Sequence, residues 1–285
     1  TKKDFNECFI IGGGPSIKNQ NLDLLVDKFT IVHNAFFLLK DTYKLKPSLY
    51  VIEDPWPAKD NKEELNKINE SIWEGFDKLH SNNFDSINGL GNLYFQEEVV
   101  QKLNDALNTS EEFKDFFSIK NYNFGDKIIP GFQSYKDLLS NFFKKLKLEK
   151  EELIFGNPTL ENILYSFEEN RSVFIDLYEE SILDSRFLDY SMVLQCSNSY
   201  YGYLNDNELI VQKDYLSHNL EIPLNFKNFN SLFCDKLESK YIELIKVLEA
   251  TQFFRMLPFK LKSNELIKAK YFYVHGCKLL SEVFN

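Results

Sequence analysis

The sequence predicts an α/β fold in which a parallel sheet is flanked by helices. Three short apolar runs, at residues 9–11, 30–32 and 49–52, are separated by helical or loop stretches. This alternation is typical of βαβ units, because parallel strands need a crossover connection. Three glycines directly follow the first run, as at the end of a strand that turns into a helix. The first third therefore predicts a Rossmann-like sheet, and the remainder predicts a helical, loop-rich second part.

Helical periodicity dominates after the third run. Apolar residues recur at spacings of three and four in three segments, and each set forms one helix face. Thr109 and Glu112 predict a capping box at a helix start. Two later apolar runs, at residues 173–177 and 190–194, predict further sheet strands. The three faces are Val99, Leu103 and Ala106; Tyr135, Leu138, Leu139, Phe142 and Leu146; and Tyr241, Leu244, Ile245 and Leu248.

Two domains follow from this organisation. The first covers residues 1–195 and contains the sheet; the second covers residues 196–285, a loop and C-terminal helices that pack on the first or form one domain with it. The polar segments 59–78 and 81–92 predict variable surface structure over a site. Residues 197–219, which are rich in Tyr, Asn and Ser, predict a loop that covers a site.

Composition excludes several classes of protein. The 285 residues are 44% apolar, which is enough for a large core. The formal net charge of −10 argues against a nucleic-acid-binding protein, which needs a basic face. Four single cysteines and scattered histidines predict neither a zinc site nor a redox pair. No run of 18 apolar residues occurs, so we expect a cytoplasmic protein. Residues 253–262, FFRMLPFKLK, predict a packed helix end, and peripheral contact with the inner membrane stays open.

A phosphate-binding turn is the most specific local feature. In residues 9–18, FIIGGGPSIK, an apolar strand meets glycines that accept positive φ and let a ligand lie against the main chain. Proline suits the first helical turn and serine is a good cap, so free amides and the positive end of the helix dipole would face the turn. This turn consists of Gly12, Gly13, Gly14, Pro15 and Ser16.

Two common nucleotide motifs do not fit. The dinucleotide fingerprint GxGxxG matches Gly12 and Gly14, but Ile17 stands where the third glycine belongs. That fingerprint also needs an acidic residue after the second strand, and residues 29–37, FTIVHNAFF, contain none. A Walker loop is excluded because no Lys-Ser or Lys-Thr pair follows the glycines.

A third pattern fits better. The turn GGGPSI followed by IVHNAFF resembles the family 42 bacterial sialyltransferases and related MptE-like proteins, over about the first 60 residues. The resemblance implies a glycosyltransferase-B-like fold of sialyltransferase type, in which Gly12 to Ser16 and Asn34 bind a cytidine monophosphate (CMP) sugar. Gly13 departs from the pattern, because the sialyltransferases usually have Asn there, which removes one nucleotide hydrogen bond. Glu53 and Asp54, which follow the third apolar run, resemble the MptE-like group.

The same resemblance implies catalytic residues. In sialyltransferases, tyrosines after a late strand bind the nucleotide phosphate, and a later histidine is the general base. In this sequence the tyrosines would be Tyr200 and Tyr201, and the base would be His218. His33, at a predicted strand end near the ligand crevice, is a second catalytic candidate. Sugar transfer needs a base of near-neutral pKa and donors for the leaving phosphate, so no metal or other cofactor is required. The expected partners are a nucleotide-sugar donor and a surface-glycan acceptor such as lipooligosaccharide or capsule, and a homo-oligomer stays open.

Two alternatives to this transferase remain. An MptE-like pyrophosphokinase would use ATP and magnesium, with Glu53, Asp54 and Asp60 as metal ligands. A non-catalytic nucleotide-binding module of envelope glycan assembly would keep the glycine turn without turnover.

Overall fold

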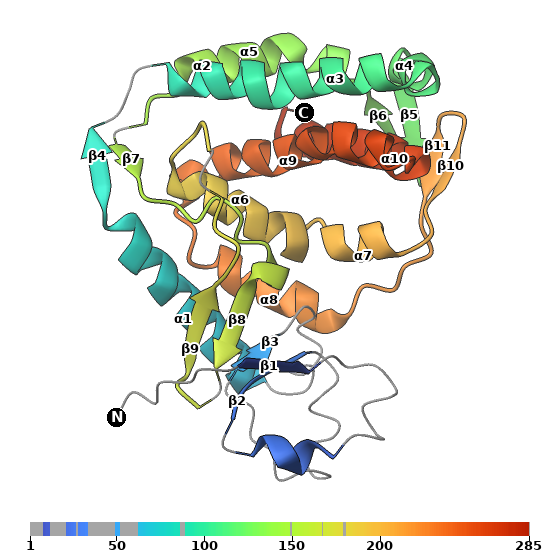
Figure 1. Ribbon diagram of the computed structural model, residues 1–285. Helices are drawn as coiled ribbons and strands as arrows, with labels where there is room; N and C mark the ends of the chain where they lie inside the picture. Colours follow the sequence, from blue (N-terminus) through green and yellow to red (C-terminus); the bar gives the residue numbers. More distant parts are fainter. Residues whose placement is uncertain are drawn as a thin grey trace. The chain divides into compact units, whose positions relative to one another are not determined.

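The computed structural model describes residues 8–11, 21–26, 28–33, 49–51, 62–85, 89–148, 150–166, 168–178 and 181–284 (Figure 1). By its internal contacts the chain divides into two compact units. Unit 1 contains residues 1–79, 157–177 and 223–236, and unit 2 contains residues 80–156, 178–222 and 237–285. The domain boundary predicted at residue 195 falls inside a helix of unit 2, α6 (Arg186–Ser197).

Unit 1 is built on a five-stranded mixed sheet in the order β1-β2-β3-β8-β9. The first three strands are parallel, which confirms the three predicted early strands. β8 and β9 run antiparallel, so a full Rossmann-like parallel sheet is not formed by the described residues. The elements of unit 1 are β1 (Cys8–Ile11), the 3-10 helix η2 (Leu22–Leu25), β2 (Phe29–His33), β3 (Leu49–Val51), α1 (Lys62–His80, whose last residue belongs to unit 2), the 3-10 helix η7 (Leu160–Asn162), β8 (Ile163–Ser166), β9 (Arg171–Phe174) and α8 (Leu224–Cys234).

The polar segment 59–78 forms most of helix α1. Despite its many charges, this helix buries Leu65, Ile72 and Phe76 on one face, which is the pattern of an amphipathic helix. Its Trp73 ring stacks on Phe233 of α8, with ring centroids 4.9 Å apart. The charged residues of α1 therefore form the solvated side of a core helix.

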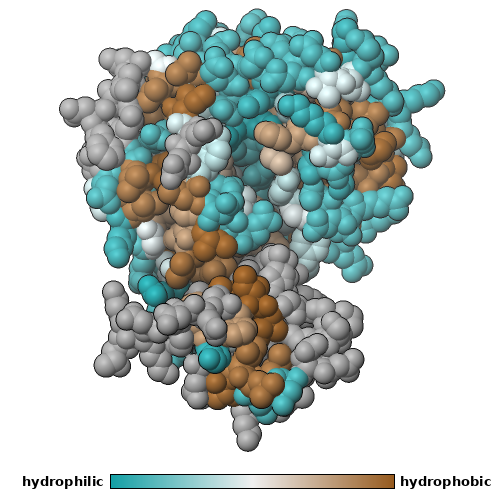
Figure 2. Space-filling view, in the orientation of Figure 1, coloured by the Kyte–Doolittle hydropathy of each residue, from teal (hydrophilic) through white to brown (hydrophobic). Residues whose placement is uncertain are grey.

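Unit 2 is mainly helical, and its other elements pack around the long antiparallel helices α9 and α10. Figure 1 shows α2, α3, α4 and α5 on one side of this pair and α6 and α7 on the other. A four-stranded sheet, β10-β11-β5-β6, and a two-stranded sheet, β4-β7, complete the unit. In the view of Figure 2 the surface over α3 and α4 is mainly hydrophilic, which agrees with the charged side chains on their outer faces.

The elements of unit 2, besides α6, are β4 (Asn83–Asp85), α2 (Leu90–Tyr94), the π-helix η5 (Phe95–Gln101), α3 (Lys102–Thr109), α4 (Glu111–Phe117), β5 (Asn121–Phe124), β6 (Lys127–Pro130), the 3-10 helix η6 (Phe132–Ser134), α5 (Lys136–Lys145), β7 (Lys150–Glu152), α7 (Tyr201–Asp206), β10 (Ile210–Gln212), β11 (Tyr215–Ser217), the 3-10 helix η8 (Ser239–Tyr241), α9 (Ile242–Lys262) and α10 (Leu266–Phe284).

Close packing of α9 against α10 depends on Gly276. A Cβ atom at this position would lie 2.7 Å from Cε1 of Phe254 and 3.2 Å from the Ala250 carbonyl oxygen. Contacts this short show that a glycine is needed where the two helices meet. Residues 253–262, in the second half of α9, bury Phe253, Phe254 and Leu257 completely, so the segment is packed as predicted.

The strand predicted at residues 190–194 is wrong, because this run is part of helix α6. Ten of its twelve residues are buried, polar ones such as Asp189 and Gln195 included, so the helix has no exposed polar face opposite a single apolar one. A short continuous apolar run is compatible with a buried strand or with a buried helix. The serine that precedes the helix, Ser185, accepts a hydrogen bond from the Phe187 amide and acts as its N-cap.

Two other predicted details are shifted. The strand predicted at residues 173–177 is β9, which ends at Phe174; Asp176 follows with a φ of 60°, which an extended strand does not contain. The capping box predicted at Thr109 is wrong by one residue, because Ser110 is the N-cap and accepts a 3.1 Å hydrogen bond from the Phe113 amide. Thr109 instead donates to the Asp105 carbonyl within α3.

Candidate functional site

The parallel strands of unit 1 end together at one edge of the sheet. Ile11 of β1 lies opposite Val32 of β2, and His33 of β2 lies opposite Val51 of β3. Ligands of parallel α/β sheets bind outside this carboxyl edge. His33 is the last residue of β2 and lies at the edge, as predicted.

Sequence continuity relates the other predicted residues to this edge. The glycine turn from Gly12 to Ser16 begins directly after β1, and Asn34 comes directly after β2. Glu53 and Asp54 follow β3 after one intervening residue. All of these, together with Asp60, lie outside the described residues.

A small cavity lies in unit 1 between α1, β8 and α8. Its volume is about 30 Å³, and its lining is mainly apolar. It is too small for a nucleotide. It is lined by Leu65, Ile68, Ile72, Leu160, Ile163, Tyr165 and Phe229.

In unit 2, Tyr200 directly precedes helix α7 and Tyr201 is the first residue of that helix. Tyr200 has left-handed backbone angles, with φ 55° and ψ 37°, and precedes the first residue of α7. This conformation is uncommon for a bulky side chain. Burial, followed by the nearby Glu249, raises the pKa of the Tyr200 hydroxyl. The Tyr201 ring packs against Phe272, with centroids 5.5 Å apart.

His218 follows strand β11 and is half-buried. Its Nδ1 accepts a 3.2 Å hydrogen bond from the Leu220 amide. Burial, followed by Lys278, lowers the pKa of the ring, so the neutral form is favoured. Because Nδ1 uses its lone pair on an N–H donor, the proton of the neutral ring lies on Nε2. In this arrangement His218 offers a hydrogen-bond donor at Nε2.

A second histidine, His275 of α10, lies beside His218, although nothing in the sequence around it had indicated a role. It is buried, and neither ring nitrogen has a hydrogen-bond partner in the described part of the chain. Burial, then Lys278, then His218 lower its pKa well below the usual value. The Tyr271 hydroxyl beside it is also buried and unpartnered there. One sequence signal could have found the group, because Tyr271, His275 and Lys278 are spaced by four and three residues on one helix face.

An unbroken series of rings connects two of the predicted residues across α9 and α10. The ring centroid of Tyr201 lies 6.4 Å from that of Phe253, which lies 4.7 Å from that of His275. The ring centroid of Tyr271 lies 6.3 Å from those of both His275 and His218. The structure therefore brings Tyr201 and His218 onto the same helix pair, although 16 residues lie between them in the sequence.

Glu249, in the middle of α9, is the second residue that the sequence did not reveal. It is fully buried, and its carboxylate oxygens accept hydrogen bonds from Asn198 and Ser199. Burial, which the donors Ser199 and Asn198 oppose, raises its pKa to about 7. A carboxyl group with a pKa near 7 can take up or release a proton at neutral pH, which is a property of many functional sites.

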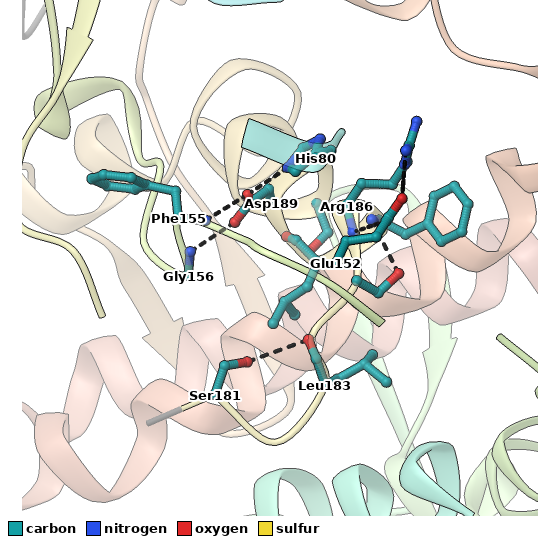
Figure 3. A network of polar contacts seen from close by, with 12 residues as sticks. His80, Glu152, Phe155, Gly156, Ser181, Leu183, Arg186 and Asp189 are labelled. Atoms are coloured by element: carbon teal, nitrogen blue, oxygen red, sulfur yellow. Dashed lines mark hydrogen bonds and ion pairs between the residues drawn. The ribbon is translucent and has the colours of Figure 1, made fainter. Parts of the chain in front are cut away.

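A further buried carboxylate, Asp189 of α6, is structural. Its oxygens accept the backbone amides of Phe155 at 2.9 Å and Gly156 at 2.8 Å, and Oδ2 lies 2.9 Å from Nε2 of His80 (Figure 3). Asp189 and His80 are both fully buried. Neither side chain faces solvent. The Asp189 carboxylate therefore stabilises the turn at Phe155 and Gly156, where Gly156 has a φ of 79°.

Comparison of the chain with protein-family models, curated proteins and solved structures finds no match. Within the described ranges no helix is long and apolar enough to cross a membrane. The same ranges contain no cluster of three or more His, Cys, Asp or Glu side chains suited to a metal ion.

Proposed function

We propose that unit 1 binds the nucleotide of a CMP-activated, sialic-acid-like sugar and that the chain transfers this sugar to a surface-glycan acceptor without a metal. The observation that carries the proposal is the register of the three parallel strands. Their carboxyl ends lie at one edge, and the glycine turn and Asn34 follow two of these ends in the sequence.

The chemistry of these residues supports a phosphate-containing ligand. A glycine turn after a parallel strand offers backbone amides to phosphate oxygens, since no Cβ blocks the approach. An asparagine after the neighbouring strand adds a donor and an acceptor for a base or a ribose. The resemblance to sialyltransferases selects a cytidine nucleotide among the phosphate ligands.

The predicted roles of Tyr200, Tyr201, His218 and His33 stay predictions. Tyr200 and Tyr201 would hold the leaving phosphate. His218 or His33 would take the proton of the acceptor hydroxyl.

Ligand-induced thermal stabilisation tests the nucleotide site. A ligand that binds only the folded protein adds about 2.7 kcal/mol of stability at 100 times its Kd. We expect CMP, but not uridine, guanosine or adenosine monophosphate, to raise the melting temperature in the presence of a chelator. Isothermal titration with CMP under the same conditions should give the affinity.

Matched variants locate the site. Asn34→Ala should weaken CMP binding, whereas Asn104→Ala, on the exposed side of α3 in unit 2, should leave it unchanged. Stabilisation by ATP only with magnesium would instead support the pyrophosphokinase with Glu53, Asp54 and Asp60. CMP binding without sugar transfer would support the non-catalytic module, and no stabilisation by any nucleotide would refute the proposal.

A further inference from the structure

His275 of α10 is a buried ring without a polar partner. It is 7% exposed, and neither ring nitrogen forms a hydrogen bond in the described part of the chain. Three aromatic rings pack on it instead, with centroids 4.7, 6.0 and 6.3 Å from its own: Phe253 of α9, Phe124 of β5 and Tyr271 of α10. The attraction of a cation to such rings is smaller than the cost of burying an unpaired charge. These surroundings therefore favour the neutral imidazole.

Two basic neighbours also oppose protonation of His275. Lys278 lies three residues further along α10, and His218, which follows β11, contacts Tyr271. Burial, then Lys278, then His218 lower the pKa of His275 well below its ordinary value of 6.5. All three act in the same direction, so this direction does not depend on a balance between opposing contacts.

The acidic groups on the elements around His275 are engaged elsewhere. Glu282 of α10 pairs with Lys278 at 2.9 Å, and Glu249 of α9 is bonded to the residues before α7. Asp214, between β10 and β11, accepts a hydrogen bond from a side chain of β5. The other charged groups at the turns of the two hairpins are exposed; they are Asp126, Lys127 and Lys213. On α9, Arg255 and Lys260 are paired with Glu98 and Glu265.

Phe124, at the tip of the β5–β6 hairpin, is the outermost of the three rings on His275. Phe253 and Tyr271 are fully buried, whereas Phe124 is half-buried. The three residues that follow it, 125–127, are exposed. Displacement of Phe124 is therefore the movement that hydrates His275 with the smallest loss of buried apolar surface.

The same hairpin tip is bonded to strand β11. The Gly125 amide donates to the Leu216 carbonyl at 2.9 Å. Strand β11 leads directly into His218, whose Nδ1 accepts the Leu220 amide. Movement of the tip thus reaches the segment that carries His218.

We propose that residues 124–127 form an acid-responsive lid, which closes over the neutral ring of His275 and opens when this ring takes up a proton. Burial destabilises the imidazolium, which has no hydrogen-bond acceptor in the closed state. Opening hydrates the imidazolium and releases the bond between Gly125 and Leu216. This inference does not depend on the proposed sugar transfer.

Linkage gives the direction and size of the effect. In the closed state the pKa of His275 lies well below 6.5, and in the open state it returns to this ordinary value. Between the two values the open state binds more protons, so opening becomes more favourable as the pH falls through this range. From pH 7.5 to pH 5.5 the opening constant should increase roughly tenfold.

Amide hydrogen exchange of the full chain measures this opening. The Gly125 amide is the reporter, because its acceptor lies on β11. After correction for the intrinsic exchange rate, its protection should fall roughly tenfold from pH 7.5 to pH 5.5. His275→Phe should abolish this pH dependence, because a phenyl ring does not titrate. His218→Asn, which removes the neighbouring titratable ring and keeps an acceptor for the Leu220 amide, should retain it.

The lid would be overturned by a pH dependence that persists in His275→Phe, or by its loss in His218→Asn, which would make His218 the sensor. Gly125 protection equal to that of the Val274 amide in the α10 core at both pH values would also overturn it, since the opening would then be global unfolding. If His275→Phe does not fold, Phe124→Ala decides. Without the covering ring His275 is hydrated at both pH values, so the pH dependence should be lost, and a retained tenfold change would refute the inference.

Discussion

Replacement of Glu249 by glutamine should change how the stability of the protein depends on pH. In the folded state burial raises the pKa of this carboxyl from 4.5 to about 7. Between these values the folded state binds more protons than the unfolded state, so the free energy of unfolding falls as the pH rises. Because one pKa unit corresponds to about 1.4 kcal/mol, the loss between pH 5 and pH 8 is about 2 to 3 kcal/mol. The loss levels off roughly one pH unit above the folded-state pKa.

The assay is urea unfolding at pH 5 and pH 8, followed by far-ultraviolet circular dichroism. At pH 5 the carboxyl is mostly protonated and resembles the amide, so wild type and Glu249→Gln should have similar stability. At pH 8 the variant should be more stable by about 2 to 3 kcal/mol. Subtracting the free energy of unfolding of the wild type from that of the variant at each pH cancels the contributions of the other titrating groups. Glu243→Gln serves as the exposed control. A stability difference that is the same at both pH values would refute the assignment of a near-neutral pKa to Glu249.

Three further predictions concern unit 2. Asp189→Asn should destabilise the protein by about 3 kcal/mol in urea unfolding, because it removes the charge that accepts two buried backbone amides; a loss below about 1 kcal/mol would contradict this. Gly276→Ala should destabilise the protein by about 1 to 2 kcal/mol, because the added Cβ would overlap Phe254. Gly202→Ala, whose added Cβ meets no atom within 4 Å, should be neutral or stabilising. Equal melting temperatures of the two variants would argue against the tight contact at Gly276. His275→Phe should stabilise by about 1 kcal/mol, because it removes buried nitrogens without partners, and a lower melting temperature would show that the ring nitrogens bind something.

Elements with a clear period or with turn residues at their ends were predictable from the sequence. The three parallel strands of unit 1 are short apolar runs, and the glycines after the first run mark where it ends. The helical spacing of Tyr241, Leu244 and Ile245 likewise predicted a helix, and in the structure these residues lie at the end of η8 and the start of α9. Helix α6 was not predictable, because it is buried on nearly all sides and its polar residues do not gather on one exposed face. Tertiary context decided its conformation.

The candidate site was only partly predictable, for a different reason. Tyr201 and His218 were predicted as site residues only through a resemblance in their order along the chain. In the structure, ring contacts through Phe253, His275 and Tyr271 connect the two. Burial and the absence of partners are properties of the fold, so a sequence shows neither. Glu249 gives no signal for this reason, because it is one of many glutamates and only its neighbours distinguish it.

The hydrogen bond between His218 and the Leu220 amide limits the catalytic role predicted for this histidine. A general base acting through Nε2 needs a free lone pair there, whereas the observed bond keeps the proton on Nε2 and the lone pair on Nδ1. Moving the proton to Nδ1 makes two donors face each other, Nδ1–H and the Leu220 N–H, which costs about 1 to 3 kcal/mol, or a roughly 5- to 150-fold smaller population of that tautomer. General acid–base catalysis contributes about a hundredfold or more. A role as base at Nε2 therefore requires His218 to release the Leu220 amide first. The lowered pKa of the ring favours the neutral form that a base requires.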